Sequence, residues 1–373
     1  MWGFNLGGVG KCFLAYAGLG KIDSRLTVHT ACINLKNESI ELAPLREIGA
    51  TIIDIKGRLD FSWLPRCKQL IDEVKPDLIF THGFNGPIVV QMLRIRYGLR
   101  VPLLCSYHSE YHPPSFNRRF VAPLFNRTVH ELYKHAALSI VTVAQVNRVF
   151  LVRRGVDGAK ISVIYNGIAS RPLAHRKLSD LLPNVKLDDN AITVGIASRL
   201  DPIKGLAYLL EAVAMVRRKG IPINLILLGD GPLRASLQAE AEALGISEYV
   251  HFIGFQNNIP EWLDTLDIFA LPSLSEAHSI SLLEAMRAGK AIVATNVGGN
   301  PESVRDGNEA ILVPPADSQA LAGALTRLVG DVDLRHRLGV AARKRFETEF
   351  TEDIMKRRLA DWLLSFAPQV QSR

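Results

Sequence analysis

Two glutamates, Glu276 and Glu284, stand eight positions apart in a segment suited to bind a charged ligand. Glu276 follows an apolar strand pattern and is expected in a loop, and Ser279 can cap a helix over Ile280–Ala288. Glu284 lies roughly 7–8 Å along that helix from its cap, about the distance from a diphosphate to its ribose hydroxyls. A helix N-terminus binds anions, so we expect a diphosphate on the backbone of Ala277, His278, Ser279 and Ile280.

These residues resemble the signature of retaining glycosyltransferases with the GT-B fold, most closely family 4. The family pattern of Glu, seven residues, Glu-Ala-Met and a later Gly stands here as EAHSISLLEAMRAG over 276–289. A Gly-Gly turn into a helix follows over 298–302, with Asn300 expected as its cap. If the two glutamates stood alone, an amphipathic helix that carries one surface glutamate would explain them equally simply. The other family motifs, which follow in the expected order, argue against that alternative.

Upstream motifs continue the resemblance in the family's order. Residues 195–205 (GIASRLDPIKG) match a strand and basic loop of the family. Residues 229–232 (GDGP) match the turn that lies near the nucleotide in the family. The resemblance implies that Arg199 and Lys204 bind the donor diphosphate, because arginine offers two parallel N–H groups and lysine adds a point charge. It also places the nucleotide base beside Phe255, for which an ordinary core role stays open.

The first half of the chain is expected to bind the acceptor. Gly7 and Gly8 precede the helical stretch Lys11–Leu19 and resemble the family's N-terminal glycine loop, whose N–H groups approach the donor phosphates and the acceptor. A P-loop fails on spacing, since its first glycine would fall on Asn5 and its hydroxyl residue on Cys12.

A histidine after another strand pattern extends the resemblance. His108 stands where similar transferases carry a histidine that reaches the donor sugar, and His82 is expected on the acceptor side. A metal site through His108 and His112 is not expected, since Pro113 and Pro114 prevent a continuing helix and no cysteine cluster supports one. The resemblance implies no metal and no cofactor, with a UDP- or GDP-sugar as substrate.

The resemblance implies transfer of a sugar with retention of its anomeric configuration. Arg199, Lys204 and the helix N-terminus would stabilise the departing nucleoside diphosphate, and Glu276 would orient the sugar. Two other classes stay open. One is a nucleotide-sugar epimerase, which would act on the donor alone, or another GT-B enzyme such as a phosphorylase. The other is a non-catalytic membrane- or glycan-binding protein, which would bind nucleotide weakly or not at all.

Short apolar runs alternate with helical patterns in both halves, which predicts α/β units with parallel sheets. The resemblance implies the GT-B architecture, with the final helix crossing back to the first domain. We expect an acceptor domain over 1–168, a linker over 169–190 and a nucleotide-sugar domain over 191–373, with the two sheets facing across a cleft. The expected strands are 26–30, 50–55, 78–82, 103–108, 139–143, 161–165, 192–198, 225–229, 250–254, 268–272, 291–295 and 311–313.

The 373-residue chain carries a formal net charge of +7, and the excess is uneven. Residues 91–160 hold eleven Lys or Arg against three Asp or Glu. Arg118, Arg119 and Arg127, interleaved with aromatic residues, fit either a solvated helix or a face for anionic lipid, and we favour the lipid face. The acceptor would then be a glycan or polyprenyl-linked glycan, and no nucleic-acid module accompanies the basic residues.

The sequence contains no signal-peptide pattern, and no apolar run nears twenty residues. Four cysteines without CxxC spacing fit reduced structural thiols. We therefore expect a cytoplasmic protein, peripheral on the inner face of the membrane.

Overall fold

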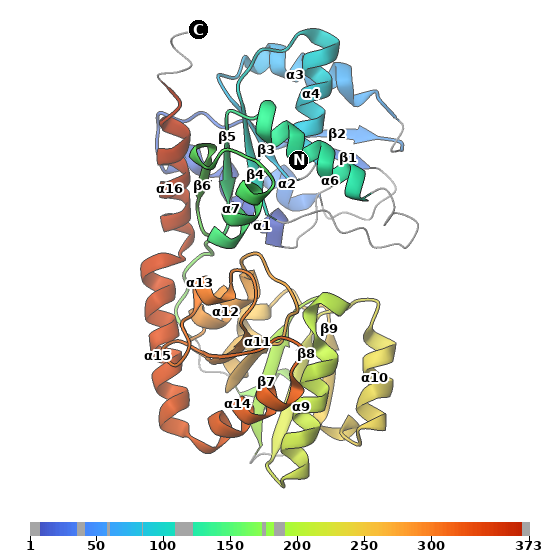
Figure 1. Ribbon diagram of the computed structural model, residues 1–373, viewed down its shortest axis with the longest axis vertical. Helices are drawn as coiled ribbons and strands as arrows, with labels where there is room; N and C mark the ends of the chain where they lie inside the picture. Colours follow the sequence, from blue (N-terminus) through green and yellow to red (C-terminus); the bar gives the residue numbers. More distant parts are fainter. Residues whose placement is uncertain are drawn as a thin grey trace. The chain divides into compact units, whose positions relative to one another are not determined.

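The computed structural model describes residues 8–35, 42–57, 60–83, 85–108, 122–173, 177–182 and 191–367. The chain divides into two compact units, one of residues 1–167 with 352–373 and one of residues 168–351 (Figure 1). Both units are built on parallel strands alternating with helices, which confirms the predicted α/β fold class. No helix in the described ranges is long and apolar enough to cross a membrane.

The first unit contains a two-stranded sheet and a four-stranded sheet. In the first, β1 (Ala31–Leu35) pairs with β2 (Thr51–Ile55). The second has the order β3 (Ile79–His82), β4 (Leu103–Tyr107), β5 (Ser139–Thr142) and β6 (Ile161–Val163). The helices are α1 (Gly8–Ala17), η1 (Leu19–Lys21), α2 (Ala43–Glu47), α3 (Trp63–Val74), α4 (Asn85–Tyr97), α6 (Ala122–His135), α7 (Gln145–Arg153), η2 (Gly158–Lys160) and α16 (Glu352–Leu364).

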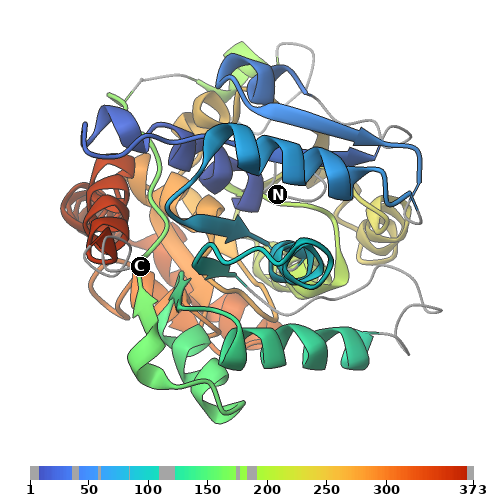
Figure 2. The ribbon, with the colours of Figure 1, turned by 90° about the horizontal axis from the view of Figure 1, so that it is seen from above.

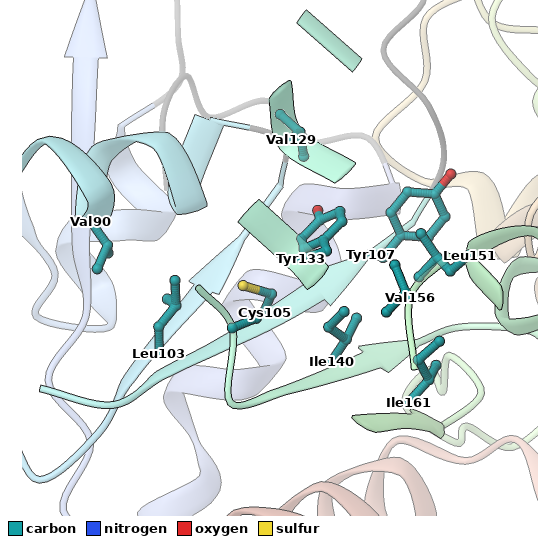
Figure 3. Close-up of a cluster of buried hydrophobic side chains, with 11 residues drawn as sticks. Val90, Leu103, Cys105, Tyr107, Val129, Tyr133, Ile140, Leu151, Val156 and Ile161 are labelled. Carbon is teal, nitrogen blue, oxygen red and sulfur yellow. The ribbon is translucent and has the colours of Figure 1, made fainter. Parts of the chain in front are cut away.

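The core of the first unit forms around β4, in which every residue is buried. Figure 3 shows Leu103 and Cys105 beneath side chains from α4 and α6, with Ile140 of β5 to one side. Tyr107 and Tyr133 meet edge to face, with ring centroids 5.9 Å apart. Helix α4 contacts both α3 and α6, and the view in Figure 2 shows it between them. An apolar run buried on both faces is typical of a central parallel strand.

The strand predicted over 26–30 is wrong, because the structure has no strand there and β1 begins at Ala31. Ala31 pairs with Thr51, the first residue of β2, and the carbonyl of Thr30 still accepts from the N–H of Thr51 over 2.8 Å. The segment Leu26–Thr30 therefore reaches the sheet at its last residue without forming a strand. Helix α1 begins at Gly8, three residues before the predicted Lys11.

Helix α16 belongs to the first unit although it follows the second in sequence. It contacts α1 and η1, and the Trp362 ring lies edge-on to Phe80 of β3 at 5.6 Å. The N–H of Gly167 donates to the sulfur of Met355 over 3.1 Å. These contacts complete the apolar packing beside α1.

The second unit is a six-stranded parallel sheet with the order β12-β11-β10-β7-β8-β9. Its strands are β7 (Ile192–Ala197), β8 (Ile223–Leu228), β9 (Val250–Gly254), β10 (Ile268–Leu271), β11 (Ala291–Thr295) and β12 (Ile311–Val313). Its helices are α8 (Leu178–Leu181), η3 (Pro202–Lys204), α9 (Leu206–Arg218), α10 (Arg234–Ala243), η4 (Ser247–Tyr249), α11 (Ile259–Thr265), α12 (Ile280–Arg287), α13 (Asn300–Ser303), α14 (Ser318–Gly330) and α15 (Val332–Glu349).

The strand order of the second unit reverses between β7 and β10. The chain moves outward from β7 through β8 to β9, returns to β10 beside β7, and then moves outward the other way. Right-handed crossovers therefore put helices on both faces: α9 contacts α10 and α14, while α12 contacts α11 and α15. The reversal makes the carboxyl ends of β7 and β10 the place where ligands bind in such sheets.

A matched pair of leucines tests the core of the first unit. Leu103 is fully buried in β4, whereas Leu124 on α6 is 68 % exposed. We expect Leu103→Ala to lower the free energy of unfolding by about 2–5 kcal/mol, because it leaves a cavity. Leu124→Ala should change it by less than about 0.5 kcal/mol. Urea unfolding followed by circular dichroism measures both, and equal losses would contradict the assigned core.

Candidate active site

The loops after β7 and β10 meet at the reversal point of the second unit's sheet. The loop after β7 carries Arg199 and Lys204, and the loop after β10 carries Glu276 and leads into α12. The N–H of Leu274 donates to the carbonyl of Ile203 over 2.8 Å, which ties the two loops together. Residues more than seventy positions apart in sequence thus share one site.

Lys204 and Glu276 form an ion pair. Lys204 Nζ lies 2.6 Å from Glu276 Oε1, and the two side chains are only 21 % and 10 % exposed. The hydroxyl of Ser273 donates to the same Oε1 over 2.8 Å. None of the residues that the structure describes donates to Oε2 of Glu276. One oxygen of this carboxylate is therefore held, and the other stays available to a ligand.

Asp201 orders the basic loop, a role that was not predicted from the sequence. Its Oδ1 accepts from the N–H of Ile203 over 3.2 Å and caps η3, the short helix that carries Lys204. Its Oδ2 lies 2.5 Å from Nη2 of Arg199. The Arg199 side chain is 69 % exposed, so most of its N–H donors face open space. The signal was present as Asp-Pro, a common start of a helix.

Glycines let the loops of the site approach one another. A Cβ at Gly205, where φ is +62°, would stand 2.2 Å from the carbonyl oxygen of Pro272. A Cβ at Gly298, where φ is +53°, would stand 1.6 Å from the carbonyl oxygen of Glu276. Real Cβ atoms do not approach this closely, so both positions require glycine.

The Gly-Asp-Gly-Pro turn after β8 packs against the basic loop in the same way. A Cβ at Gly229 would lie 2.0 Å from the carbonyl oxygen of Ser198, and one at Gly231 would lie 2.4 Å from that of Leu200. The N–H of Leu200 donates to the carbonyl of Asp230 over 3.0 Å. The turn thus supports the backbone on both sides of Arg199.

Helix α12 begins as predicted at Ile280. Ser279 is its N-cap, and the Ser279 hydroxyl accepts from the N–H of Leu282 over 3.4 Å. No acidic residue stands in the first turn, so the positive end of the helix dipole is not offset there. Glu284 lies one turn further along and is buried. Gly289, with φ of +63°, follows the end of the helix, as expected.

The His278 side chain turns into the protein. It is buried, its Nε2 lies 3.2 Å from the Ser303 hydroxyl, and its ring lies 5.4 Å from that of Phe350. Burial lowers the pKa of His278 to about 3, so the imidazole is neutral at physiological pH. The role predicted for His278 in diphosphate binding can therefore involve only its backbone.

The predicted cap of α13 is wrong by one residue. Gly299 is the N-cap, and Asn300 is the first residue of the helix. The side-chain amide of Asn300 is fully buried and donates to the carbonyl of Thr295 over 3.0 Å. Asn300 thus joins the end of β11 to the turn that packs on Glu276.

Phe255 follows β9 and is 65 % exposed. The carbonyl of the preceding Gly254 accepts from the N–H of Gly229 over 2.8 Å, which joins this end of β9 to the turn after β8. An exposed aromatic ring excludes the core role that the sequence left open. The role in base binding stays a prediction.

The comparisons with known proteins agree with these motifs. Residues 180–345 match the model for glycosyl transferases group 1, and residues 37–170 match the model for glycosyltransferase family 4. One match lies in the second unit, and the other lies mainly in the first. The chain belongs to the family 4 glycosyltransferases of the GT-B fold.

Individual relatives of this glycosyltransferase resemble it over most of its length. The amylovoran biosynthesis glycosyltransferase AmsK of Erwinia amylovora is 28 % identical over 299 residues, covering 77 % of this chain and 70 % of AmsK. The 2-deoxystreptamine N-acetyl-D-glucosaminyltransferase of Streptomyces fradiae is 28 % identical over 323 residues, or 80 % and 74 % of the two chains. HepE of Anabaena, solved with UDP-glucose, has the same fold, with a TM-score of 0.81, 23 % identity and 98 % of both chains covered.

Other predicted residues of the transferase lie in the first unit. His108 follows β4 and is buried, which lowers its pKa to about 4. Its ring lies edge-on to that of His82, with centroids 4.6 Å apart, and His82 Nδ1 lies 2.9 Å from the Ser106 hydroxyl. Gly8 is the first residue of α1, and Gly7 lies outside the described residues.

The predicted lipid-binding face of the transferase is described only in part. Arg118 and Arg119 lie outside the described residues, and Arg127 is exposed on α6. Membrane binding stays a prediction. In the parts of the chain that the structure covers, no three His, Cys, Asp or Glu side chains are grouped so that they could hold a metal ion.

Gly298 of the transferase can be compared with Gly307, which has a similar φ of +73° but no atom within 4 Å of an added Cβ. Gly307→Ala should cost about 1–2 kcal/mol of stability through its backbone conformation alone. We expect Gly298→Ala to cost clearly more, because the backbone of Glu276 must move. Urea unfolding of the two variants measures the difference, and equal losses would contradict the close approach.

Burial of His278 makes the stability of the transferase depend on pH. The unfolded histidine takes up a proton below about pH 6.5, whereas the folded one stays neutral down to about pH 3, so stability falls as the pH drops through this window. When the pH is lowered from 7 to 5.5, we expect the free energy of unfolding of His278→Asn to fall by about 1 kcal/mol less than that of wild type. The exposed His336, changed to Asn, is the control. Equal acid losses in both variants would contradict the prediction.

Proposed function

We propose that this glycosyltransferase moves a sugar from a UDP- or GDP-sugar to a hydroxyl of a glycan or lipid-linked glycan in polysaccharide synthesis. The observation that carries the proposal is the ion pair of Lys204 and Glu276 beside the N-terminus of α12, at the reversal point of the sheet. Two similar proteins support the details of the proposal. AmsK is a glycosyltransferase of amylovoran biosynthesis, and HepE was solved with UDP-glucose.

The diphosphate would bind between the basic loop and α12. An ammonium group has three N–H donors, so Lys204 can contact Glu276 and a phosphate oxygen together. The exposed Arg199 can add two parallel bonds, and the helix N-terminus adds unpaired N–H groups. Glu284 would bind the ribose hydroxyls, and Phe255 would lie beside the base.

The sugar would lie on the side of Glu276, whose Oε2 can accept hydrogen bonds from its hydroxyls. His108 would also contact the sugar, since a neutral imidazole can donate or accept a hydrogen bond. Gly7 and Gly8 would complete the phosphate contacts.

The chemical step in this proposal depends on stabilising the leaving group. As the bond between the anomeric carbon and the diphosphate breaks, negative charge grows on the phosphate oxygens. Arg199, Lys204 and the dipole of α12 are positioned to stabilise that charge. The acceptor hydroxyl would pass its proton to the departing phosphate on the same face, giving retention without a metal ion.

The acceptor would bind the first unit, and the proposal places the enzyme in the cytoplasm at the inner face of the membrane. Exposed Leu124 and Arg127 on α6 fit a surface that meets anionic lipid. Such a surface would present a polyprenyl-linked acceptor to the enzyme.

A thermal-shift panel of UDP, GDP, ADP and their common sugars tests the proposal. A ligand at about 100 times its Kd adds about 2.7 kcal/mol of stability, so one nucleotide should raise the melting temperature clearly. Lys204→Ala should reduce this shift and lower kcat/KM at least about 100-fold. The exposed Lys219, changed to Ala, is the control. No shift with any nucleotide would contradict the proposal, and turnover of the donor without an acceptor would indicate an epimerase.

A further inference from the structure

Ser273 occupies a fixed position at the carboxyl end of β10. It is fully buried and follows Pro272, the residue after the strand. Its carbonyl accepts from the hydroxyl of Thr295, at the end of β11, over 2.6 Å. The backbone of Ser273 is thus joined to the neighbouring strand, so its side chain projects from the rigid edge of the sheet.

The hydroxyl of Ser273 acts on one carboxylate oxygen. It donates to Oε1 of Glu276 over 2.8 Å, and Lys204 contacts the same oxygen. The main chain of Glu276 is confined independently, since Gly298 packs directly on its carbonyl oxygen. The backbone and the side chain of Glu276 are therefore held by different neighbours.

We propose that Ser273 is a positioning residue that presents Oε2 of Glu276 to the donor sugar, an inference that rests on the proposed function. Lys204 has a second task at the diphosphate, and a flexible ammonium does not fix the rotation of a carboxylate by itself. A hydroxyl held by the sheet does, because its hydrogen bond is short and directional. Ser273 then contributes to recognition of the sugar and not of the nucleotide.

The test compares nucleotide with nucleotide sugar by isothermal titration calorimetry. The pairs are UDP with UDP-glucose and GDP with GDP-mannose, and the pair that binds wild type is used for the variants. Ser273→Ala should raise the Kd of the nucleotide sugar about 10-fold and leave the Kd of the free nucleotide within about 2-fold. A structural defect would weaken both ligands. Ser275→Ala, at an exposed serine of the same loop, should change neither.

A double-mutant cycle tests whether Ser273 acts through Glu276. In a Glu276→Ala background, Ser273→Ala should have no further effect on nucleotide-sugar affinity, because no carboxylate remains to be positioned. Additive losses, equal weakening of nucleotide and nucleotide sugar, or wild-type affinity in Ser273→Ala would each overturn the proposal while leaving the proposed function standing. Failure of wild type to bind either pair would overturn the proposed function itself, and this role with it.

Discussion

The close approach of backbone segments at one edge of the six-stranded sheet is the constraint on which the site depends. Gly205, Gly229, Gly231 and Gly298 each bring a loop so near a carbonyl oxygen that no side chain fits between them. This packing brings the loops after β7, β8, β10 and β11 together. This close packing lets a lysine and a glutamate on separate loops form an ion pair.

The packed edge gives the site two chemically different sides. On one side, the basic loop and the N-terminus of α12 offer positive charge. On the other, a carboxylate presents one unshared oxygen. The ion pair joins the two sides, and because both members are mostly screened from water, removing either would leave a poorly solvated charge. The polarity suits a ligand with an anionic end and a hydroxyl-rich end, as a nucleotide sugar has.

Local features of the site could be read from the sequence because they depend on neighbouring residues. Ser279 caps α12 by accepting a hydrogen bond from the N–H of Leu282, only three residues later in the sequence. The buried strands of the second unit, such as β8, appear in the sequence as continuous apolar runs. Contacts that depend on strand order could not be read. Lys204 meets Glu276 only because β7 lies beside β10, and nothing in the apolar pattern specifies that order.

The wrong predictions have the same origin. Alternating residues before Ala31 look like a strand, yet a strand exists only where a partner supplies hydrogen bonds. Asn300 is a good cap by type, but its amide is occupied by the carbonyl of Thr295. In each case a distant partner decided between two locally reasonable outcomes.

The placement of α16 has a consequence for the order of folding during synthesis. The second unit is one continuous stretch, whereas the first is closed by a helix made only after residues 168–351. Until α16 emerges from the ribosome, Phe80 lacks its Trp362 neighbour and the surface beside α1 is uncovered. The unit that begins first on the ribosome is therefore completed last, and its apolar side is open to chaperones or to other nascent chains for most of translation.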